Sequence, residues 1–403
     1  MKKLSILVLV FLTISCNNKK PIKQLDFTSM SWQNIKNDAN GKDITMMMWM
    51  GDAKINQYMK NYIVPKLKKE NNINLEIING QGNAIVQLLM AENQANKSKS
   101  DIDLMWINGE TFYQLNQIKA LYGPWTNLLP NSKFIDFKNP FIGTDFQQPV
   151  NGYEMPWGNV QMTLIYNSKK VQNPPQTRVE LLAFVKKNPG VFTFDNQFTG
   201  LTFLKALLID ISGNKEELSG KFDNVKYKKY STLLWSYLNE LKPYLWRKGL
   251  VFPENVAQMH QLYANGELWF TMSNNDAEVD SKVQEGLFPT TSMAYVPSFG
   301  TIQNSHYIGI PTNSENKTAA MVVANTLISV EAQVKKMDPT IWGDGTVLDR
   351  TTLNEKDKSS FENIPTRIKA PKRATIQSKA LKELAPEYMV KLAEDFRKNI
   401  INN

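Results

Sequence analysis

The sequence contains very little cysteine and histidine, with one cysteine and two histidines in 403 residues. A single cysteine cannot form an internal disulfide bond, and so few soft donors exclude the common ligand sets for zinc and copper. A carboxylate or tyrosine site for iron is the one metal site that the composition leaves open. The G-x-S-x-G, H-E-x-x-H and phosphate-loop motifs are also missing. We therefore expect no metal, no cofactor and no familiar catalytic centre.

Long apolar runs are missing too, apart from one at the N-terminus. Lys2 and Lys3 precede eleven mostly apolar residues, 4–14. This run is shorter than the roughly 20 residues that a membrane-spanning helix needs, and it is typical of a secretory signal. We predict that residues 1–16 form a signal peptide and that the mature protein is exported to the periplasm or the cell surface.

The only cysteine, Cys16, lies directly after this run in the stretch TISCNN. Its position resembles the lipobox cysteine of bacterial lipoproteins, although Leu12 stands one position further from the cysteine than the usual pattern has it. We predict that Cys16 is lipidated and that the lipid holds the protein at a membrane surface. The alternative is an ordinary soluble signal peptide followed by an incidental cysteine.

Charge is mildly basic, with 47 Lys and Arg against 38 Asp and Glu, and removal of a signal peptide would take two of the lysines away. Lysines gather in short runs at 67–70 and 226–230, as on solvated helix faces. No aromatic-basic motif accompanies them, so we expect no nucleic-acid partner. Residues 17–42 are rich in Lys, Asn and Gln and predict a tether.

From residue 43 onward, short apolar runs alternate with helical spacing. Strands are predicted at 43–50, 73–78 and 102–107, with helices around 55–63 and 84–94 between them. Pro65 is expected to kink or divide the first helix, because proline lacks the amide hydrogen. Strands that alternate with helices indicate a parallel sheet covered by helices, which is an α/β fold.

Polar and glycine residues follow each of these predicted strands. In parallel α/β sheets, ligands bind beyond the carboxyl ends of the strands, where glycines let the backbone come close to a ligand. The tips are therefore candidate ligand-binding loops, although each one alone is equally compatible with an ordinary strand-to-helix turn. The candidates are Gly51, Asp52, Gln81, Asn108, Gly109 and Glu110.

The chain organisation changes near residues 149–167, where turn residues lead into an alternating, strand-like stretch. Helices predicted at 181–187, 203–212 and 230–246 begin a second lobe, and a strand with a polar loop follows at 267–276. A strand at 307–313 and a helix at 317–329 are assigned to the first lobe again. We predict lobe 1 at 43–150 plus about 305–335, lobe 2 at 151–304, and a C-terminal helical segment at 336–403 that packs on the lobes.

Several stretches together resemble the extracellular solute-binding proteins of bacterial ABC importers, in an uncharacterised branch allied to the thiamine, polyamine and iron binders. They are GDAKINQYM, DLMWINGETF, LYGPWTNLLPN, DFQQPVNGYEMPWGNVQ, NPGVFTF, FTGLTFLK, FTMSNND, GTIQNSHYIGIP and IWGDGTVL. The resemblance implies a two-lobed periplasmic-binding-protein-like fold of type II, with the ligand in a cleft between the lobes. It also implies a monomer that works with ABC permease and ATPase subunits. The chain is expected to cross between lobes around 149–163 and to return around 296–310.

The resemblance also extends the set of candidate ligand-binding residues. The tips at 51–52 and 108–110 match the first-lobe loops that face the cleft. In the crossing segment Trp157 and Asn159 are the candidates, and the Trp157 ring is expected to stack on the ligand. The second lobe and the return segment add Asn274, Asn275, Asp276 and Thr301.

The chemistry of these candidates favours a cationic ligand. Trp49, Trp106 and Trp157 lie at or near predicted strand ends, and Asp52, Glu110 and Asp276 are predicted to lie in neighbouring loops. Aromatic faces beside carboxylates suit a small organic cation with a flat ring, such as a thiamine-like compound. For Trp106 and Trp49 a place in the core is the competing interpretation.

Three alternatives accompany this hypothesis. A carbohydrate also stacks on tryptophan and pairs with Asn, Gln and Asp side chains. An exported hydrolase, such as a glycosidase that uses cleft carboxylates, is the competing function, although we expect no enzymatic activity. A surface adhesin is a third possibility, and it predicts no small-molecule cleft. His306, near the return segment, is interpreted first as a structural histidine.

Overall fold

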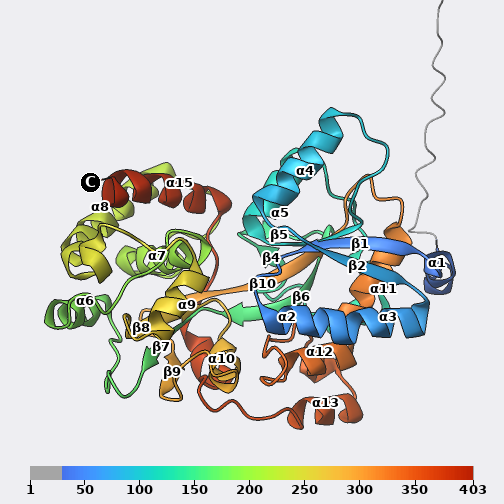
Figure 1. The fold of residues 1–403 in the computed structure, drawn as a ribbon. Helices are drawn as coiled ribbons and strands as arrows, with labels where there is room; N and C mark the ends of the chain where they lie inside the picture. Colours follow the sequence, from blue (N-terminus) through green and yellow to red (C-terminus); the bar gives the residue numbers. More distant parts are fainter. Residues whose placement is uncertain (1–29, 403) are drawn as a thin grey trace, which may run out of the picture.

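The computed structural model describes residues 30–402 of the chain. These residues form two lobes, with strands β6 and β10 passing between them (Figure 1). The predicted signal peptide and the predicted lipidation at Cys16 lie outside the described residues. Within the described part, no helix is long and apolar enough to cross a membrane.

Lobe 1 is built on a sheet with the strand order β11-β10-β3-β1-β2, and β6 pairs with the other edge of β10. Strands β1, β2 and β3 are parallel, while β10 runs antiparallel to β3 and β6, so the predicted parallel core is confirmed. The first elements are α1 (Trp32–Ala39), β1 (Asp43–Met48), α2 (Ala53–Tyr58), η2 (Met59–Ile63), α3 (Val64–Asn71), β2 (Asn74–Asn79), α4 (Asn83–Gln94), β3 (Leu104–Ile107) and α5 (Gly109–Gln117).

Helices cover both faces of this sheet (Figure 1). The face with α2 and α3 buries an apolar core that includes Met46, Met48 and Ile308, and the face with α4 and α5 buries a second core that includes Phe112 and Tyr307. Further elements of this lobe are η3 (Thr126–Leu128), η4 (Pro130–Phe134), β4 (Thr144–Asp145), β5 (Gln148–Pro149), α11 (Lys317–Leu327), α12 (Val330–Met337), η7 (Arg350–Thr352) and α13 (Glu355–Glu362).

Pro65 does not divide its helix as the sequence predicted. The π-helical turn η2 directly precedes it, and α2, η2 and α3 follow one another without a break. A π-turn widens the helix by one residue, and such turns accommodate the missing amide and the bulky ring of a proline. The result is one long helix along the sheet.

The predicted tether at 17–42 is wrong for its last part, because α1 lies there. The Ser31 side chain accepts a hydrogen bond from the backbone N–H of Asn34 and caps the helix, and Ile35 and Ala39 are fully buried. The Thr318 hydroxyl of α11 donates to Asp38 at 2.6 Å. Few apolar residues are enough to fix α1 in place, because this helix packs along only one narrow stripe of its surface.

Lobe 2 has an antiparallel sheet, β8-β7-β9, surrounded by helices. Its core is aromatic and aliphatic, and α7 is buried along almost its whole length. The elements are β7 (Thr163–Asn167), α6 (Arg178–Lys187), α7 (Phe198–Ser212), α8 (Asn224–Leu241), η5 (Lys242–Tyr244), η6 (Trp246–Gly249), α9 (Val256–Ala264), β8 (Phe270–Ser273), α10 (Glu278–Gln284) and β9 (Ser292–Tyr295).

Three segments connect the lobes. Two of them, β6 (Glu154–Gln161) and β10 (Thr301–Gly309), pair antiparallel from Gln303–Gln161 to Gly309–Glu154, with a shift in register after His306. The third segment leaves α13 and leads into lobe 2 through α14 (Arg373–Ile376), η8 (Gln377–Lys379), β11 (Ala380–Leu381), α15 (Pro386–Phe396) and η9 (Arg397–Ile401).

The C-terminal residues 336–403 are thus shared between the lobes. Leu353 and Phe361 belong to the core of lobe 1, whereas Tyr388, Leu392 and Phe396 belong to the core of lobe 2. Helix α15 lies beside α7 and α8 (Figure 1). Relative motion of the lobes therefore has to bend three connections instead of two.

Candidate functional site

A cavity of about 500 Å³ lies beside the crossing strands. Small-molecule sites in proteins typically have about 300–1,000 Å³, so this cavity is large enough for a solute. Its walls come from lobe 1, from both crossing strands and from the third connecting segment. The lining residues are Asp136, Asn139, Ile142, Asn159, Gln161, Asp276, Gln303, Met337, Thr346, Val347, Leu348, Asp349, Arg350, Thr351, Arg373, Ile376 and Gln377.

Amide side chains dominate the floor of this cavity. Asn159 of β6 donates to the hydroxyl of Ser305 at 3.0 Å and to the carbonyl of Phe141 at 3.0 Å, and its oxygen accepts from the Gln303 amide at 2.6 Å. Gln377 donates to Gln303 at 3.1 Å. Asn159, predicted from the sequence to bind ligand, therefore lines the cavity and orients its neighbours.

Asp276 lines the same cavity but is fully occupied by protein partners. It accepts from the guanidinium of Arg373 at 2.9 and 3.0 Å, from Arg367, and from the backbone N–H of Gln161 at 3.1 Å. Burial disfavours its charged form, yet the charges of Arg373 and Arg367 hold the pKa of Asp276 below its ordinary value. Ligand binding by Asp276 stays a prediction, while the contacts themselves show that the carboxylate fixes the third connecting segment.

On the face of the lobe 1 sheet that α2 covers, Asp52 joins the two lobes. Its carboxylate caps α2 by accepting from the N–H groups of Lys54 and Ile55, and it pairs with Lys282 of α10 at 2.6 Å. Both side chains of this pair are about 11% exposed. Lys54 lies 3.7 Å from Glu285 in the same contact. The negative charge of Asp52 is therefore already neutralised across the lobe boundary.

The Trp157 ring lies in the core, so the expectation that it stacks on a ligand is wrong. It is 0% exposed and packs against the rings of Trp106 at 5.0 Å, Trp342 at 5.3 Å and His306 at 5.3 Å. Strand β6 is buried at every position because it lies between layers on both faces. Gly158 permits this packing, since a Cβ there would lie 1.9 Å from the His306 ring.

His306 is a structural histidine, as the sequence favoured. Its Nε2 lies 3.0 Å from Asp344, and the same carboxylate pairs with the buried ammonium of Lys336. Although burial opposes ionisation, His306 and Lys336 lower the pKa of Asp344 to about 2. This network packs against the cluster of rings around Trp157 and stabilises the crossing strands.

Most other predicted site residues contact other residues of the protein and do not line the cavity. The Thr301 hydroxyl is buried and donates to the carbonyl of Met162. Asn274 donates to Thr199, and Asn275 accepts from the N–H of Ala277. The Glu110 carboxylate accepts a hydrogen bond from Gln114, and the Asn108 side chain makes no capping bond to α5 within the described chain. Gly51 and Gln81 are exposed at loop tips. Of the twelve candidates, only Asn159 and Asp276 line the large cavity, and none lines the smaller crevice described next.

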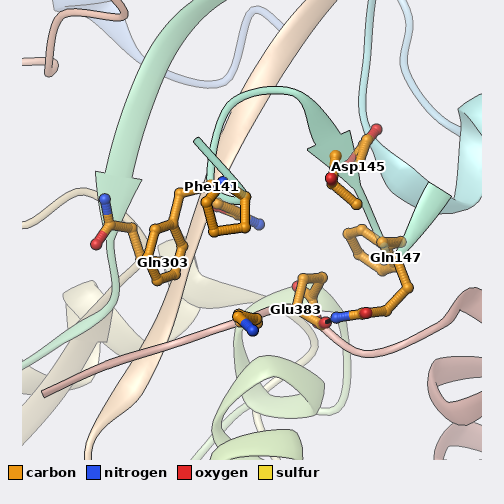
Figure 2. A pocket seen from close by; sticks show the side chains of 10 residues that line it. Phe141, Asp145, Gln147, Gln303 and Glu383 are labelled. Carbon is orange, nitrogen blue, oxygen red and sulfur yellow. Dashed lines mark hydrogen bonds between the residues drawn. The ribbon is translucent and has the colours of Figure 1, made fainter. Parts of the chain in front are cut away.

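A narrow crevice of about 10 Å³ lies beside Phe141 (Figure 2). It is lined by Pro140, Phe141, Thr144, Asp145, Phe146, Gln147, Gln303, Asn304, Lys382 and Glu383. The tip of the β4–β5 hairpin reaches across the lobe boundary here: Gln147 donates to the carbonyl of Glu383 at 2.5 Å. Phe146 is 1% exposed and packs into the core of lobe 2.

Gly109 owes its position to this hairpin. A Cβ on Gly109 would lie 1.7 Å from the Phe146 ring, so no side chain fits there. Its backbone N–H also donates to Asp145. The sequence indicated close backbone approach at Gly109, and the structure places a side chain of the protein itself against it.

Buried charges that sequence analysis missed gather beside the crevice. Asp145, Glu154 and Glu383 are 2%, 0% and 7% exposed, and Lys205 of α7 is 0% exposed. Burial raises the pKa of Glu154 well above its ordinary value, and the charge of Asp145 adds to this. The signal that could have found Lys205 is its place inside the otherwise apolar run FLKALLI, since fully buried lysines are rare unless paired.

Residues 30–402 contain no group of three or more His, Cys, Asp or Glu side chains that could hold a metal ion. Two α/β lobes, three connecting segments and a cavity along them define the class of protein. The architecture is that of the type II periplasmic binding proteins.

The chain matches the family described as bacterial extracellular solute-binding protein over residues 62–360. It is also 36% identical over 336 residues to Protein YnjB of Escherichia coli (strain K12), a match that covers 82% of this chain and 86% of that protein. The chain therefore belongs to the family of bacterial extracellular solute-binding proteins. It is accordingly an exported protein.

Solved structures share the fold at low sequence identity. A putative spermidine/putrescine ABC transporter protein from Listeria monocytogenes has a TM-score of 0.60 and 15% identity, covering 88% of this chain and 98% of that chain. The periplasmic binding protein AfuA from Actinobacillus pleuropneumoniae, with bound fructose-6-phosphate, has a TM-score of 0.62 and 12% identity, covering 89% and 98%. Iron-bound HitA from Pseudomonas aeruginosa has a TM-score of 0.55 and 14% identity, covering 89% and 99%. These ligands differ in chemistry, so the shared fold does not identify the ligand of this chain.

Proposed function

We propose that this protein captures a small organic cation between its lobes and delivers it unchanged to an ABC permease. The observation that carries the binding role is the 500 Å³ cavity, whose walls include both crossing strands and the third connecting segment. A solute there touches parts of the chain that move when the lobes move. It therefore favours the closed arrangement through contacts that the open arrangement lacks.

The cationic class is supported by the balance of buried charge near the cavity. Among the described residues, Lys205 is the one lysine paired with the group Asp145, Glu154 and Glu383, because Lys382, which lines the crevice, pairs with Glu216. Asp136 and Asp349 line the cavity together with Arg350 and Arg373, and Arg373 is neutralised by Asp276. The carboxylates named from the sequence support this class less well, because Asp52 and Asp276 are paired with basic side chains of the protein. A flat, thiamine-like ring has no free tryptophan face at Trp157.

A carbohydrate is the second candidate ligand, and a specific observation favours it. Five amide side chains line the cavity, and amides both donate to and accept from hydroxyl groups. They are Asn139, Asn159, Gln161, Gln303 and Gln377.

Native mass spectrometry of the purified protein, followed by calorimetric titration, tests these proposals. We expect a co-purified mass with a basic nitrogen, and binding of one solute per chain. Small-angle scattering should show a more compact molecule when the solute binds. Tight binding of neutral sugars without binding of any cation would exclude the cationic class. Turnover of the bound solute into a product would instead favour an exported hydrolase, which the family and structural matches do not favour.

We also propose that the mature protein begins at a lipid-modified Cys16 and is held at a membrane surface. The position of this cysteine after an apolar run supports the proposal. Fractionation of cells should find the protein with membranes, and Cys16→Ser should move it to the aqueous fraction. An unmodified N-terminal residue on the mature wild-type protein would contradict the proposal.

A further inference from the structure

Two buried carboxyl groups near the crevice have no salt-bridge partner among the described residues, and Lys382, which lines the crevice, pairs instead with Glu216 at 2.9 Å. Lys205 pairs with Glu383 at 2.7 Å, and its ammonium lies 4.5 Å from the centre of the Phe146 ring. Within the described residues, neither Asp145 nor Glu154 forms an ion pair at salt-bridge distance. Two buried carboxyl groups therefore have no cation of their own, and unpaired buried charges are costly.

Oxygen atoms of the same groups also lack hydrogen-bond donors. Across the part of the chain that the structure describes, this is true of Asp145 Oδ2, Glu383 Oε2 and both carboxyl oxygens of Glu154. Buried polar atoms in proteins are nearly always hydrogen-bonded, so these unpaired oxygens require an explanation. Asp145 and Glu383 both line the crevice, one from each lobe (Figure 2).

The crevice has the size of a single small group. Its volume of about 10 Å³ is close to the minimum that holds one water molecule, and an ammonium group is of similar size. Gln303 lines both the crevice and the 500 Å³ cavity, and Phe141 lies beside it (Figure 2). The two spaces are therefore neighbours, with the Gln303 side chain between them.

We propose that this crevice binds a primary or secondary ammonium group of the imported solute, with Asp145 and Glu383 accepting its N–H hydrogen bonds. This rests on the proposed function, and it narrows the ligand from any organic cation to an amine that donates hydrogen bonds. A quaternary cation supplies charge but no N–H donor for the unpaired oxygens. A divalent metal does not fit, because residues 30–402 offer no suitable ligand group.

The same contacts couple binding to lobe closure and to proton release. Asp145 belongs to lobe 1 and Glu383 to the part of the chain that packs on lobe 2, so one ammonium group bridges both lobes. Because burial and mutual repulsion favour the protonated forms of Asp145 and Glu154, their pKa values lie well above the ordinary range. An incoming cation lowers these pKa values, and we expect binding to release a proton.

Calorimetric titration of the mature protein with linear monoamines and diamines of graded length tests the proposal. Quaternary ammonium and polyol compounds of matched length serve as comparison ligands. We expect an amine to bind at least about tenfold more tightly than its quaternary counterpart, and titrations in buffers of different ionisation enthalpy should reveal the released proton. Asp145→Asn should weaken amine binding by about 10- to 100-fold, the range for one charged hydrogen bond.

Two further variants separate a binding role from a structural one. Glu154→Gln removes a buried carboxyl group whose oxygens have no hydrogen-bond partner among the described residues, so it should fold normally and reduce the proton release. Asp101→Asn changes a carboxylate that lines neither the crevice nor the cavity and whose side chain is 65% exposed, so it should leave the preference for amines over quaternary cations intact. Amine binding that is unchanged in Asp145→Asn overturns the inference. The inference is also overturned if the wild-type protein binds or carries only solutes without an N–H⁺ group, although the importer role then stands. A wild-type protein that neither carries nor binds any solute overturns both.

Discussion

Replacement of Asp276 by asparagine should destabilise the protein strongly, although the shape of the side chain hardly changes. The carboxylate accepts three hydrogen bonds from Arg373 and Gln161, at 2.9 to 3.1 Å, and it also pairs with Arg367. These contacts connect the polar loop after β8 to β6 and to the third connecting segment. An amide would turn N–H groups toward guanidinium groups that themselves only donate.

The size of the effect follows from the burial of each partner. Removing one member of a buried ion pair costs about 3–5 kcal/mol, because the other member remains buried and unpaired. The Asp276 side chain is 1% exposed and that of Arg367 is 13% exposed, whereas Arg373 is 30% exposed and regains some contact with water. We therefore expect a loss near the lower end, about 3 kcal/mol in the free energy of unfolding.

Urea unfolding at neutral pH, followed by circular dichroism, measures this loss. Asp349→Asn is the matched control, since Asp349 lines the same cavity and caps a short helix, a role that asparagine performs equally well. A loss below about 1 kcal/mol for Asp276→Asn, or one equal to the control, would refute the assignment of Asp276 as the residue that fixes the connecting segment.

The pH dependence gives an independent check of the same assignment. The pKa of Asp276 is lowered in the folded protein, so its contribution is fully present above the ordinary value of 3.8 and is lost as the pH falls through the folded value. The difference in stability between wild type and Asp276→Asn should therefore shrink below about pH 4. A difference that stays constant down to pH 2 would contradict the ion-pair explanation.

Three further predictions concern the crossing strands and the lobe boundary. Trp157→Ala should cost about 3–5 kcal/mol of unfolding free energy in urea titrations, because it opens a cavity among three rings. A small loss of unfolding free energy would instead favour the hypothesis that this ring stacks on the ligand. Asp344→Asn should remove about 2 kcal/mol of stability that the wild type loses only as the pH falls from 3.8 toward 2, as thermal melts across this range can test. Lys282→Met should shift the lobes toward the open arrangement and increase the radius of gyration in scattering experiments. Lys54→Met is the weaker control, because the ion pair of Lys54 is longer and more exposed. Equal radii of gyration for wild type and Lys282→Met would contradict this prediction.

Much of the fold of lobe 1 could be predicted from the sequence because its signals are local. The runs at 43–50, 73–78 and 102–107 coincide with β1, β2 and β3, and each ends at the glycine or asparagine that begins the next turn. The helix at α1 was missed because its composition is as polar as that of the residues before it. Only its packing on α11 distinguishes it from a tether, and packing on a distant helix leaves no local pattern.

The candidate site was less predictable because its chemistry depends on partners far apart in the chain. The rule that loops at strand ends bind ligands correctly drew attention to Asp52 and Asp276. It could not show that Lys282, 230 residues after Asp52, and Arg373, 97 residues after Asp276, neutralise them. The prediction that Trp157 stacks on a ligand failed for a related reason. Turn residues beside a strand indicate a strand end or a bulge, but they do not reveal that layers of side chains cover both faces of the strand.

The distribution of charge along the lobe boundary suggests how closure is controlled. On the face of α2, Asp52 and Lys282 already satisfy each other, so this contact favours closure whether or not a solute is present. On the face of the β4–β5 hairpin, the charges of Asp145 and Glu383 repel each other, and Lys205 pairs with Glu383. Closure there is unfavourable until a proton or a cation joins the group. Under the proposed function, closure therefore depends on the solute at the hairpin face, whereas the Asp52–Lys282 pair favours closure at all times.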